Sequence, residues 1–583
     1  MTAVTSTPAT WTASRCARDL AGAGFEPGQP LAVVVADTSE MGLAWPGGRR
    51  RVDAGSPGQV GAVLADLAGL DPRWTWWSAR QAAPGLLGAG VAPRACWDVG
   101  AVGRLMHGLR RDDPAAVWAA QRGLPQPPLA RGDLDLLDLA GEDGSAVRAD
   151  GQLSRDWLRG RWAQDGAHAA QWAATALSVQ AAQLSVLAAA ADPRPGAARS
   201  GGASLAVLTA YAESAAALLA VELERDGLPL DAGELESMLA DVVGPRPVDE
   251  AGEAGARAAR DDVVLGLFPG EPVDLRNPVA VRGLLARVGI EVPDTRSWRL
   301  EPYAASSPQV AALLAWRKAE RVATTYGYGW LDRSVDGGRL RGRWAAADGG
   351  AGRMTAQAGL HNLPAELRPA VRAEPGMVFV RGDLGQVEPR VLAAVSADPA
   401  LAGAAAEQDM YAPVAARLGC DRPTAKVAVL AAMYGQTSGA AGQALKGMDR
   451  AYPVAMAYLR AAEATGLAGR DQRTYGGRLL PGAGQQATAG HGRYVRNAVI
   501  QGAAAELFKA WAATVRSGLG ALDGQIVLCL HDELLLHVPQ VNAAAAAQLL
   551  VTALASTASW WAAGSGVRFV VEVATGATWA DAH

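Results

Sequence analysis

Three short stretches in the second half of the chain carry acidic and basic side chains in patterns that suit chemistry on phosphate. VFVRGD at residues 378–383 ends an apolar run with Asp383, and RPTAK at residues 422–426 holds two cations four positions apart. LCLHDE at residues 528–533 places two further carboxylates after another apolar run. Carboxylates that hold divalent metal and cations that hold a triphosphate are what phosphoryl transfer requires. Together the stretches predict a nucleotidyl-transfer site.

Asp383 and Asp532 are the predicted metal ligands. Mg²⁺ prefers oxygen and usually takes one or two protein carboxylates together with substrate phosphates. Two such ions, about 4 Å apart, would activate an attacking hydroxyl and stabilise a leaving pyrophosphate. Mn²⁺ is the alternative ion. A His-Asp-Glu tripeptide alone is also common in surface turns, but charges between two apolar strands are costly without a purpose.

A helix is predicted over residues 422–434, because Asp421 is a suitable N-cap just before it. At 3.6 residues per turn, one face of this helix carries four side chains. They are Arg422, Lys426, Leu430 and Tyr434. The cations lie near the helix N-terminus, where the helix dipole also favours phosphate. A spaced Arg-Lys pair alone is typical of a solvated face, but its continuation into Leu and Tyr favours a nucleotide-binding face.

The clearest strand patterns surround the carboxylates. Met377–Arg381 predicts one strand, and Gln525–Leu530 with Leu534–Val538 predicts an antiparallel hairpin whose turn is residues 531–533. An antiparallel sheet with helices on one side would let the two aspartates converge on one metal site.

The rest of the chain divides by composition. Residues 1 to about 190 alternate short apolar runs with helical stretches, which is typical of an α/β domain. The segment 191–202 is rich in Pro, Gly and Ser and is the best domain boundary. From about residue 204 the pattern is mainly helical. Residues 245–260 are polar and predict a mobile insertion.

Composition bounds the class of protein. At 583 residues, half of them apolar, the chain has room for roughly three or four domains and is not globally disordered. Its four cysteines lack the spacing of a disulfide framework or a zinc site, which favours a reducing cytoplasm. Residues 1–8 show no secretory signal, and the Ala-rich window 543–563 predicts a packed soluble helix. We therefore expect a cytoplasmic monomer without a membrane partner.

The distribution of charge is more informative than its total of −4. Residues 310–381 contain eleven basic and six acidic side chains, a local balance of +5. A cationic strip beside a carboxylate centre suits a phosphate backbone. On charge alone, a solvated surface with no partner fits equally well.

The three stretches resemble motifs A, B and C of the family A DNA polymerases, the DNA polymerase I family. The resemblance extends from about residue 204 to 583. Further segments in the family's order are VELERDGLPLD at 221–231, WRKAERVATTY at 316–326, GRMT at 352–355, LHNLP at 360–364, RTYGGRLLP at 473–481 and RYVRNAVIQG at 493–502.

This resemblance implies a mainly α, α+β right-hand polymerase domain over residues 204–583. The thumb would be at about 204–340, the palm at about 341–400 and 470–583, and the fingers at about 401–469. Template-directed addition of dNTPs to a primer 3′-hydroxyl, in replication or repair, would be the activity. Primer-template DNA and dNTPs would be the partners, at the bacterial nucleoid.

The resemblance also implies a role for each site residue. Asp383 and Asp532 would bind two Mg²⁺ ions, with Glu533 nearby in a lesser role. The residues implied to bind the incoming nucleotide are Arg422, Lys426, Leu430, Tyr434, Glu388, Gln386 and His531. Lys426 would also protonate the leaving pyrophosphate. Glu388 resembles the steric gate that blocks a ribose 2′-hydroxyl, and His531 would lie beside the primer terminus.

A second set of residues is implied to bind DNA. It consists of Arg353, Asn362, Arg478, Arg493, Asn497 and Gln501. Three of them, Arg353, Asn497 and Gln501, match positions at the minor groove, where every correct base pair presents acceptors. Arg493, Asn497 and Gln501 also share one helical face, at i, i+4 and i+8.

The sequence departs from the family pattern in several places. Leu430 stands where an aromatic residue is usual, residues 384–385 are Leu-Gly where Tyr-Ser is common, and Pro389 directly follows the gate position. These departures put fidelity, speed and sugar discrimination in doubt, but not the class of reaction.

Residues 1–195 resemble an α/β, RNase H-like 3′–5′ exonuclease domain. That nuclease needs an Asp-x-Glu and a Tyr-x-x-x-Asp to bind its metals. Here Asp37 is followed by Ser39 in the Glu position, and the second motif reads Trp172 and Ala176. Losing most metal ligands should abolish metal binding, so we expect no proofreading. Two alternatives stay open: a non-catalytic protein that holds DNA ends, and a polymerase with weak 3′–5′ nuclease activity.

Overall fold

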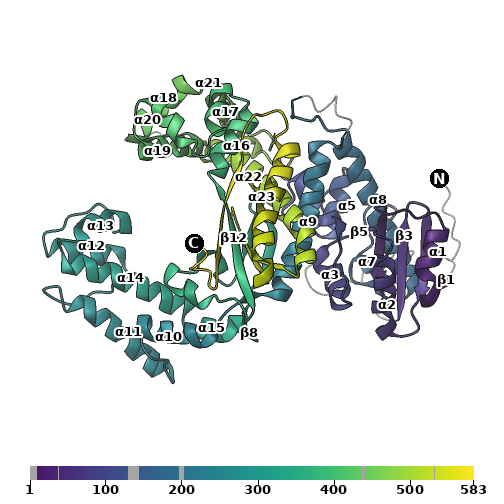
Figure 1. Ribbon diagram of the computed structural model, residues 1–583, viewed down its shortest axis with the longest axis horizontal. Helices are drawn as coiled ribbons and strands as arrows, with labels where there is room; N and C mark the ends of the chain where they lie inside the picture. The colour runs from purple at the N-terminus through teal and green to yellow at the C-terminus, as the bar shows by residue number, and fades with distance from the viewer. Residues whose placement is uncertain (1–9, 37–38, 129–143, 196–201, 436–439, 531) are drawn as a thin grey trace. The chain divides into compact units, whose positions relative to one another are not determined.

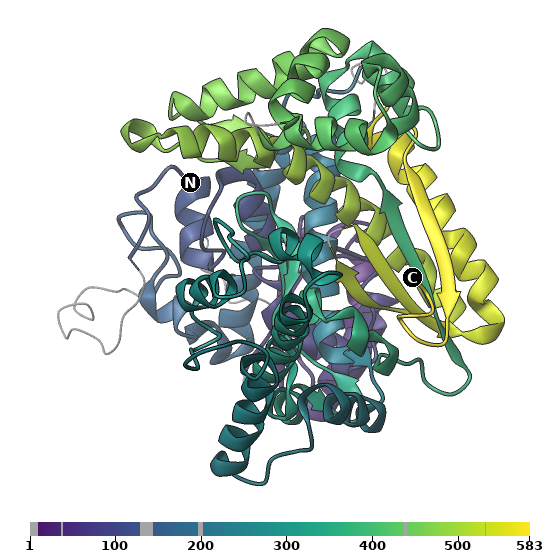
Figure 2. The ribbon, with the colours of Figure 1, turned by 90° about the vertical axis from the view of Figure 1, so that its left-hand side faces the viewer.

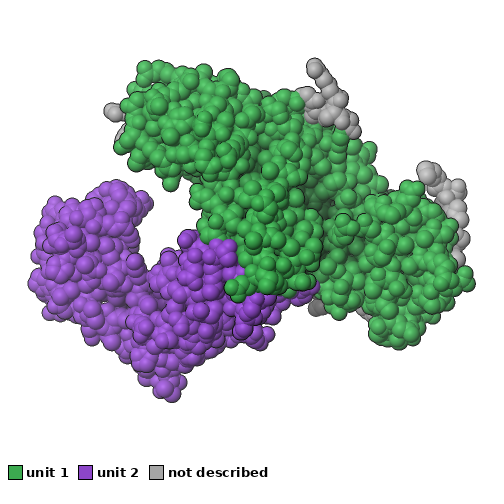
Figure 3. Space-filling view, viewed as in Figure 1, with its two compact units in different colours: residues 1–223, 344–355, 380–574 green, residues 224–343, 356–379, 575–583 purple. Residues whose placement is uncertain are grey.

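The computed structural model describes residues 10–36, 39–128, 144–195, 202–435, 440–530 and 532–583, and it leaves the side chains of 440–445 undescribed. The chain divides into two compact units (Figure 3). Unit 1 comprises residues 1–223, 344–355 and 380–574, and unit 2 comprises residues 224–343, 356–379 and 575–583.

An α/β domain forms the N-terminal part of unit 1 (Figure 1). Its mixed sheet has the order β1-β4-β3-β2-β5-β6, in which β3 pairs antiparallel with β4 and β2 and the other pairs are parallel. The strands are β1 (Thr10–Thr12), β2 (Pro30–Val35), β3 (Glu40–Trp45), β4 (Gly48–Asp53), β5 (Arg73–Trp76) and β6 (Ala95–Asp98). The helices are α1 (Cys16–Gly22), α2 (Pro57–Ala68), α3 (Ala79–Gly88), α4 (Val99–His107), α5 (Pro114–Gln121), α7 (Arg155–Leu158) and α8 (Gly166–Ala188).

Helix α8 packs closely on β2 and β3. A Cβ at Gly42 of β3 would lie 1.9 Å from the backbone nitrogen of Ala170, so only glycine lets the helix approach the sheet this far. This close approach fixes the position of α8 on the domain.

A buried ionic cluster joins helices α9 (Leu205–Asp226) and α22 (Ala489–Leu519) inside unit 1. The Glu213 carboxylate accepts hydrogen bonds from Lys509 at 2.9 Å and is paired with Arg478 at 2.7 Å. Burial alone would raise the pKa of Glu213, but Arg478 and Lys509 together bring it below its ordinary value. Burial lowers the pKa of Lys509 to about 8.

Helix α9 also belongs to the core of the N-terminal domain, through Leu218 and Val221. The division between the two compact units falls after residue 223, and the domain boundary that composition places at 191–202 stays a prediction.

A second sheet has the order β15-β16-β12-β17. Its strands are β12 (Met377–Gly385), β15 (Gln525–Leu530), β16 (Glu533–Pro539) and β17 (Val570–Gly576). β15 and β16 form the predicted antiparallel hairpin. Helix α23 (Ala543–Trp561) packs on β16 and α22 and runs alongside this sheet in Figure 2. Strand β12 continues four residues beyond its predicted end, so Asp383 lies within the strand.

Six helices between these strands share an apolar core with α22. They are α16 (Val387–Ser396), α17 (Pro399–Ala405), α18 (Tyr411–Leu418), α19 (Arg422–Tyr434), α20 (Ala440–Ala451) and α21 (Pro453–Leu467). Buried Asp398 caps two of them, because it accepts from the backbone N–H groups of Leu401 in α17 and Ala455 in α21. Four short strands remain, β10 (Trp344–Asp348), β11 (Arg353–Ala356), β13 (Gln472–Arg473) and β14 (Leu479–Leu480). They belong to unit 1, except that the last residue of β11 is assigned to unit 2.

Unit 2 is mainly helical. Its elements are α10 (Ala232–Val243), α11 (Glu250–Leu265), α12 (Pro278–Ala286), α13 (Ser297–Ala304), α14 (Pro308–Tyr326), α15 (Tyr328–Ser334), β7 (Leu228–Pro229), β8 (Val335–Asp336) and β9 (Arg339–Leu340). The expectation of a mobile insertion at residues 245–260 is corrected here. From residue 250 onward the segment is helix α11, which packs on α14 and pairs Arg260 with Glu320.

The observed architecture is an α/β N-terminal part followed by a mainly helical α+β part. The sequence predicted this order of secondary-structure classes. By length and composition, two segments of the described chain could cross a membrane, Leu205–Asp226 and Gln540–Trp561. The apolar window of the first is 78% buried within the protein and that of the second 28%. The first is therefore a core helix of unit 1.

We predict that Glu213→Gln lowers the free energy of unfolding by about 3–5 kcal/mol, because it leaves two buried cations without their shared carboxylate. Urea unfolding followed by tryptophan fluorescence measures the change. Lys509→Met should cost less, since Glu213 keeps Arg478 and the lysine is already easy to deprotonate. Equal losses in the two variants would contradict this account of the cluster.

Candidate active site

Asp383 and Asp532 belong to neighbouring parts of the second sheet. Asp383 is in β12, and Asp532 is in the turn that leads into β16, the strand beside β12. The Leu384 backbone N–H donates to the Asp532 carbonyl oxygen over 2.9 Å. This bond ties the turn to β12 directly next to Asp383, so two residues 149 positions apart in the sequence meet at one place.

Burial and nearby charges raise the pKa of both carboxylates. Burial, followed by the neighbouring charges of Asp383 and Glu533, raises the pKa of Asp532 to about 6. Burial also raises the pKa of Asp383, although Arg381 acts in the opposite direction. Ionising Asp532 in the folded protein therefore costs free energy, and this cost grows as pH rises from the ordinary aspartate range through about 6. A cation bound between the carboxylates would offset it.

Arg381 places a positive charge beside Asp383 and Glu533. Its Nη2 donates to Asp383 Oδ2 over 2.6 Å, and its Nε lies 3.0 Å from Glu533 Oε2. Its side chain is only 12% exposed. Arg381 was predicted only as part of the basic strip. Its position two residues before Asp383 on a strand puts both side chains on one face, and that signal could have found it.

The donor set suits a hard divalent ion. Among the described residues, no group of three or more His, Cys, Asp or Glu side chains is arranged to hold a metal. Two aspartates would therefore need substrate oxygens and water to complete a coordination shell, which is the arrangement that Mg²⁺ favours. The carboxylate oxygens of Asp383 and Asp532 suit Mg²⁺, and Asp383 also accepts a hydrogen bond from Arg381.

Glu388, the predicted gate, is fixed by two partners from other elements. Its Oε1 accepts from Arg353 of β11, and its Oε2 accepts from the Tyr434 hydroxyl over 2.8 Å. The Tyr434 hydroxyl also interacts with Gln501 of α22. One network thus joins four residues from separate sequence motifs, namely Arg353, Glu388, Tyr434 and Gln501. The Glu388 side chain is 15% exposed, so its carboxylate has little freedom to move.

Arg422 is paired with Asp409, a residue not predicted from the sequence. Arg422 Nε donates to Asp409 Oδ2 over 2.6 Å, and Gln386 Nε2 donates to Asp409 Oδ1 over 3.0 Å. The bond from Arg422 lowers the pKa of Asp409 below its ordinary value. Arg422 and Gln386, two of the residues predicted to bind the nucleotide, are therefore held by one carboxylate.

Helix α19 forms as predicted. Asp421 caps it by accepting from the Thr424 backbone N–H over 2.9 Å. Lys426 is exposed and, within the described part of the chain, has no ion pair or hydrogen bond, which leaves its ammonium group available. Leu430 is partly buried against the core of the six helices, so only part of it can contact a base.

Three predicted DNA contacts lie along one helix, α22. Arg493 is exposed, and Asn497 and Gln501 are half-buried. Asn497 Oδ1 is buried and has no hydrogen-bond partner among the described residues. Buried polar atoms are rarely left unpaired, so this amide is suited to a bound ligand.

The other predicted site residues are placed differently. Arg478 was predicted to contact DNA, but its side chain is buried and paired with Glu213, which favours a structural role because a phosphate cannot reach it without breaking that pair. Asn362 belongs to unit 2, where its backbone carbonyl accepts from Arg321. His531 lies outside the described residues.

Comparison with known proteins identifies this arrangement. The family model described as DNA polymerase family A matches residues 288–581, half of the chain. The chain belongs to DNA polymerase family A. The match covers β12, α19 and the β15–β16 hairpin, the elements that carry the predicted motifs.

Curated relatives of this family A chain include DNA polymerase I from Chloroflexus aurantiacus and from Deinococcus radiodurans. The first is 29% identical over 44% of this chain and 31% of the relative. The second is 25% identical over 56% of this chain and 38% of the relative. The chain thus spans about a third of the length of the curated relatives it matches.

A solved structure extends the similarity to the whole fold of the family A chain. It is the POL domain of Pol1 from M. smegmatis in complex with DNA primer-template and dNTP. The two share 20% identity with a TM-score of 0.66, over 97% of this chain and 98% of that one. At this identity the likeness shows the fold.

We predict that Arg381→Met lowers the free energy of unfolding of the metal-free protein by about 2 kcal/mol at pH 8, because Asp383 and Glu533 lose their shared cation. The loss should shrink at pH 5, where Asp532 takes up a proton. Added Mg²⁺ should raise the melting temperature of this variant more than that of the parent. Thermal unfolding with EDTA or Mg²⁺ measures both effects.

Arg470→Met is the matched control, since Arg470 is exposed and lies in the loop before β13. It should change neither value. An identical Mg²⁺ response in Arg381→Met and the parent would show that Arg381 does not compete for the carboxylates.

Proposed function

We propose that this chain is a template-directed DNA polymerase that adds dNTPs to a primer 3′-hydroxyl, with primer-template DNA and dNTPs as its partners. The observation that carries the proposal is the meeting of Asp383 and Asp532 across β12 and the β15–β16 turn, in a family A chain. A function in replication or repair, as a cytoplasmic monomer, belongs to the same proposal.

Asp383 and Asp532 would hold two Mg²⁺ ions. When bound, these ions lower the pKa of the primer hydroxyl and stabilise charge on the leaving pyrophosphate. Glu533, 6% exposed and paired with Arg381, would keep that arginine oriented. The role proposed for the two aspartates is therefore to bind the ions.

Arg422 and Lys426 would bind the triphosphate at the N-terminal end of α19, where the helix dipole adds to their attraction. Lys426 is suited to donate a proton to the leaving pyrophosphate, because its ammonium is exposed and not committed to a protein carboxylate within the described chain. Arg422 would exchange Asp409 for a phosphate, which makes nucleotide binding compete with an internal ion pair.

The N-terminal domain is proposed to be an exonuclease-like fold without nuclease activity. Support comes from Trp172 and Ala176 on α8, which stand where the resemblance expects a hydroxyl and a carboxylate. Asp37, the other candidate ligand, lies outside the described residues.

Primer extension tests the proposal. Asp532→Ala should reduce the extension rate at least ~10³-fold, because it removes a metal ligand from the reacting centre. Asp66→Ala, which changes an exposed aspartate of α2, is the control and should extend normally. Unchanged extension by Asp532→Ala would contradict the proposed two-metal mechanism. Absence of extension by the parent would favour a non-catalytic protein that holds DNA ends.

The same gel reports proofreading. With Mg²⁺ and no dNTP, a mismatched primer should keep its length. Shortening that persists in Asp532→Ala would show that the N-terminal domain is a nuclease.

The network around Glu388 predicts graded sugar selectivity. Tyr434→Phe removes one of the two bonds to Glu388 and should reduce discrimination against ribonucleotides by up to about tenfold. Glu388→Ala should reduce it further. Ratios of kcat/KM for dNTP and rNTP measure both. Tyr452→Phe is the control, because the Tyr452 hydroxyl is buried without a hydrogen-bond partner in the described chain. Equal selectivity for dNTP over rNTP in all three variants would contradict the proposed role of Glu388 as the sugar gate.

A further inference from the structure

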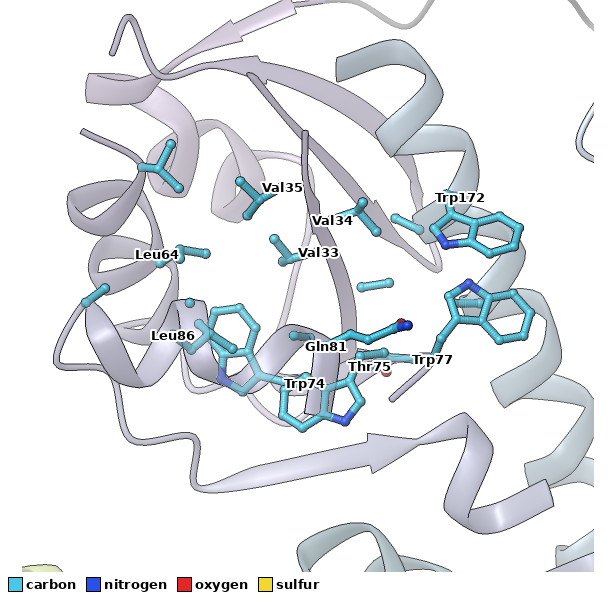
Figure 4. A pocket seen from close by; sticks show the side chains of 18 of the residues that line it. Val33, Val34, Val35, Leu64, Trp74, Thr75, Trp77, Gln81, Leu86 and Trp172 are labelled. Atoms are coloured by element: carbon cyan, nitrogen blue, oxygen red, sulfur yellow. The ribbon is translucent and has the colours of Figure 1, made fainter. Parts of the chain in front are cut away.

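Two features of unit 1 have no part in the polymerase chemistry proposed so far. One is an apolar cavity of about 500 Å³ in the N-terminal domain, whose lining includes Trp172 (Figure 4). No charged side chain is among the described residues that line it, and its walls select no particular occupant. The other is the buried ionic cluster around Glu213, whose Arg478 lies beside the turn that leads to Arg353.

That turn, residues 349–352 between β10 and β11, determines where Arg353 begins. Arg353 is the first residue of β11 and donates to the Glu388 carboxylate. The Gly352 backbone N–H closes the turn by donating to the Asp348 carbonyl oxygen over 3.1 Å. Because Gly352 directly precedes Arg353, a shift of Gly352 also shifts the Arg353 backbone and changes the geometry of the bond to Glu388.

The Arg478 guanidinium lies against Gly352. A Cβ at Gly352 would clash with Arg478 Cζ and would lie 2.5 Å from its Nε, so no larger residue fits there. Gly352 also has a φ of +70°, a left-handed conformation that favours glycine. The guanidinium and the turn are therefore in direct contact.

Arg478 is fixed from its other side by the ionic cluster. Its side chain is 4% exposed, and its Nη2 lies 2.7 Å from Glu213 Oε2. Glu213 is also buried and accepts from Lys509 over 2.9 Å. The guanidinium therefore cannot move away from Gly352 without leaving its carboxylate.

Tyr494 of α22 meets the same turn at a second point. A Cβ at Gly350 would overlap the Tyr494 hydroxyl oxygen, so this hydroxyl occupies the place that a side chain would take. The turn is thus held at Gly350 by α22 and at Gly352 by the ionic cluster.

We infer that Arg478 and Tyr494 are positioning residues for sugar selection: through the turn at 349–352 they fix the place from which Arg353 holds the Glu388 carboxylate. The inference rests on the proposed role of Glu388 as the sugar gate. It extends that role to two residues outside the hydrogen-bond network of Glu388.

Arg478→Lys tests the first contact. Lysine keeps a positive charge beside Glu213 but lacks the planar guanidinium that lies against Gly352. The ratio of kcat/KM for dNTP to kcat/KM for rNTP should fall about three- to tenfold, the worth of one weakened hydrogen bond. Lys509→Met is the matched control and should leave the ratio unchanged. Lys509 pairs with the same carboxylate but lies about 22 Å further along α22 than Tyr494.

Gly350→Ala and Tyr494→Leu test the second contact. The Gly350 backbone is outside the left-handed region, so alanine adds no backbone strain there and only displaces the Tyr494 side chain. Each change should lower the dNTP-to-rNTP ratio about two- to fivefold. The double variant should be no worse than Tyr494→Leu, because the hydroxyl is already absent. Gly520→Ala is the control, since Gly520 is exposed, has a φ of −61° and would place its Cβ in open space.

In a Glu388→Ala background, none of these changes should alter the ratio further, because the side chain that they position is gone. If Glu388→Ala lowers the ratio, an unchanged ratio in Arg478→Lys would overturn the role of Arg478. An unchanged ratio in both Gly350→Ala and Tyr494→Leu would likewise overturn the role of Tyr494. These outcomes leave the proposed function standing.

An equal fall of the ratio in Lys509→Met would also overturn the role of Arg478, because the effect would then belong to the whole cluster. Tyr494 lies partly at the surface, so Tyr494→Leu keeps the inference falsifiable if Arg478→Lys does not fold. A parent that does not extend primers, or a ratio that Glu388→Ala does not change, would overturn the inference together with the gate role on which it rests.

Discussion

The carboxylates of Asp383 and Asp532 repel each other, and the surrounding fold holds them together nonetheless. The backbone bond from Leu384 to the Asp532 carbonyl makes the β15–β16 turn part of the same sheet edge as β12. Burial and mutual charge raise the pKa of Asp532 to about 6. This confinement of anionic groups is a physical reason to propose that cations bind here.

Arg381 offsets part of the repulsion between the carboxylates when no metal is bound. It contacts Asp383 on its own strand and Glu533 on the neighbouring one, so one guanidinium serves both strands. Asp409 has the converse role at α19, where it holds Arg422 and Gln386. In both places a side chain proposed to meet substrate or metal already has a protein partner of opposite charge. In the proposed function, a ligand would add to these ion pairs or replace them, and the pairs hold the side chains in place before it binds.

Local rules predicted the elements that carry the site. Apolar runs on both sides of residues 531–533 predicted the hairpin, and Asp421 predicted the start of α19, since turns and helix caps depend on neighbours in sequence. The meeting of Asp383 with Asp532 followed from placing both on one antiparallel sheet. In the structure the two residues meet because β12 lies beside β16.

Pairings between distant segments could not be predicted in this way. Arg478 looks like a surface cation in its glycine-rich motif, yet it is buried, because Glu213 on a helix about 260 positions earlier supplies a carboxylate. Asp409 stands in no motif, and only the fold brings it to Arg422. Helix α11 was missed because its polar composition suggested an insertion, while its few core contacts, such as Val264, are made with other helices of unit 2. Binding of Mn²⁺, counted by electron paramagnetic resonance with primer-template and a non-hydrolysable dNTP present, tests the central claim directly. The account predicts two ions per chain, with at least one lost in Asp383→Asn and in Asp532→Asn, and two ions retained by both variants would contradict it.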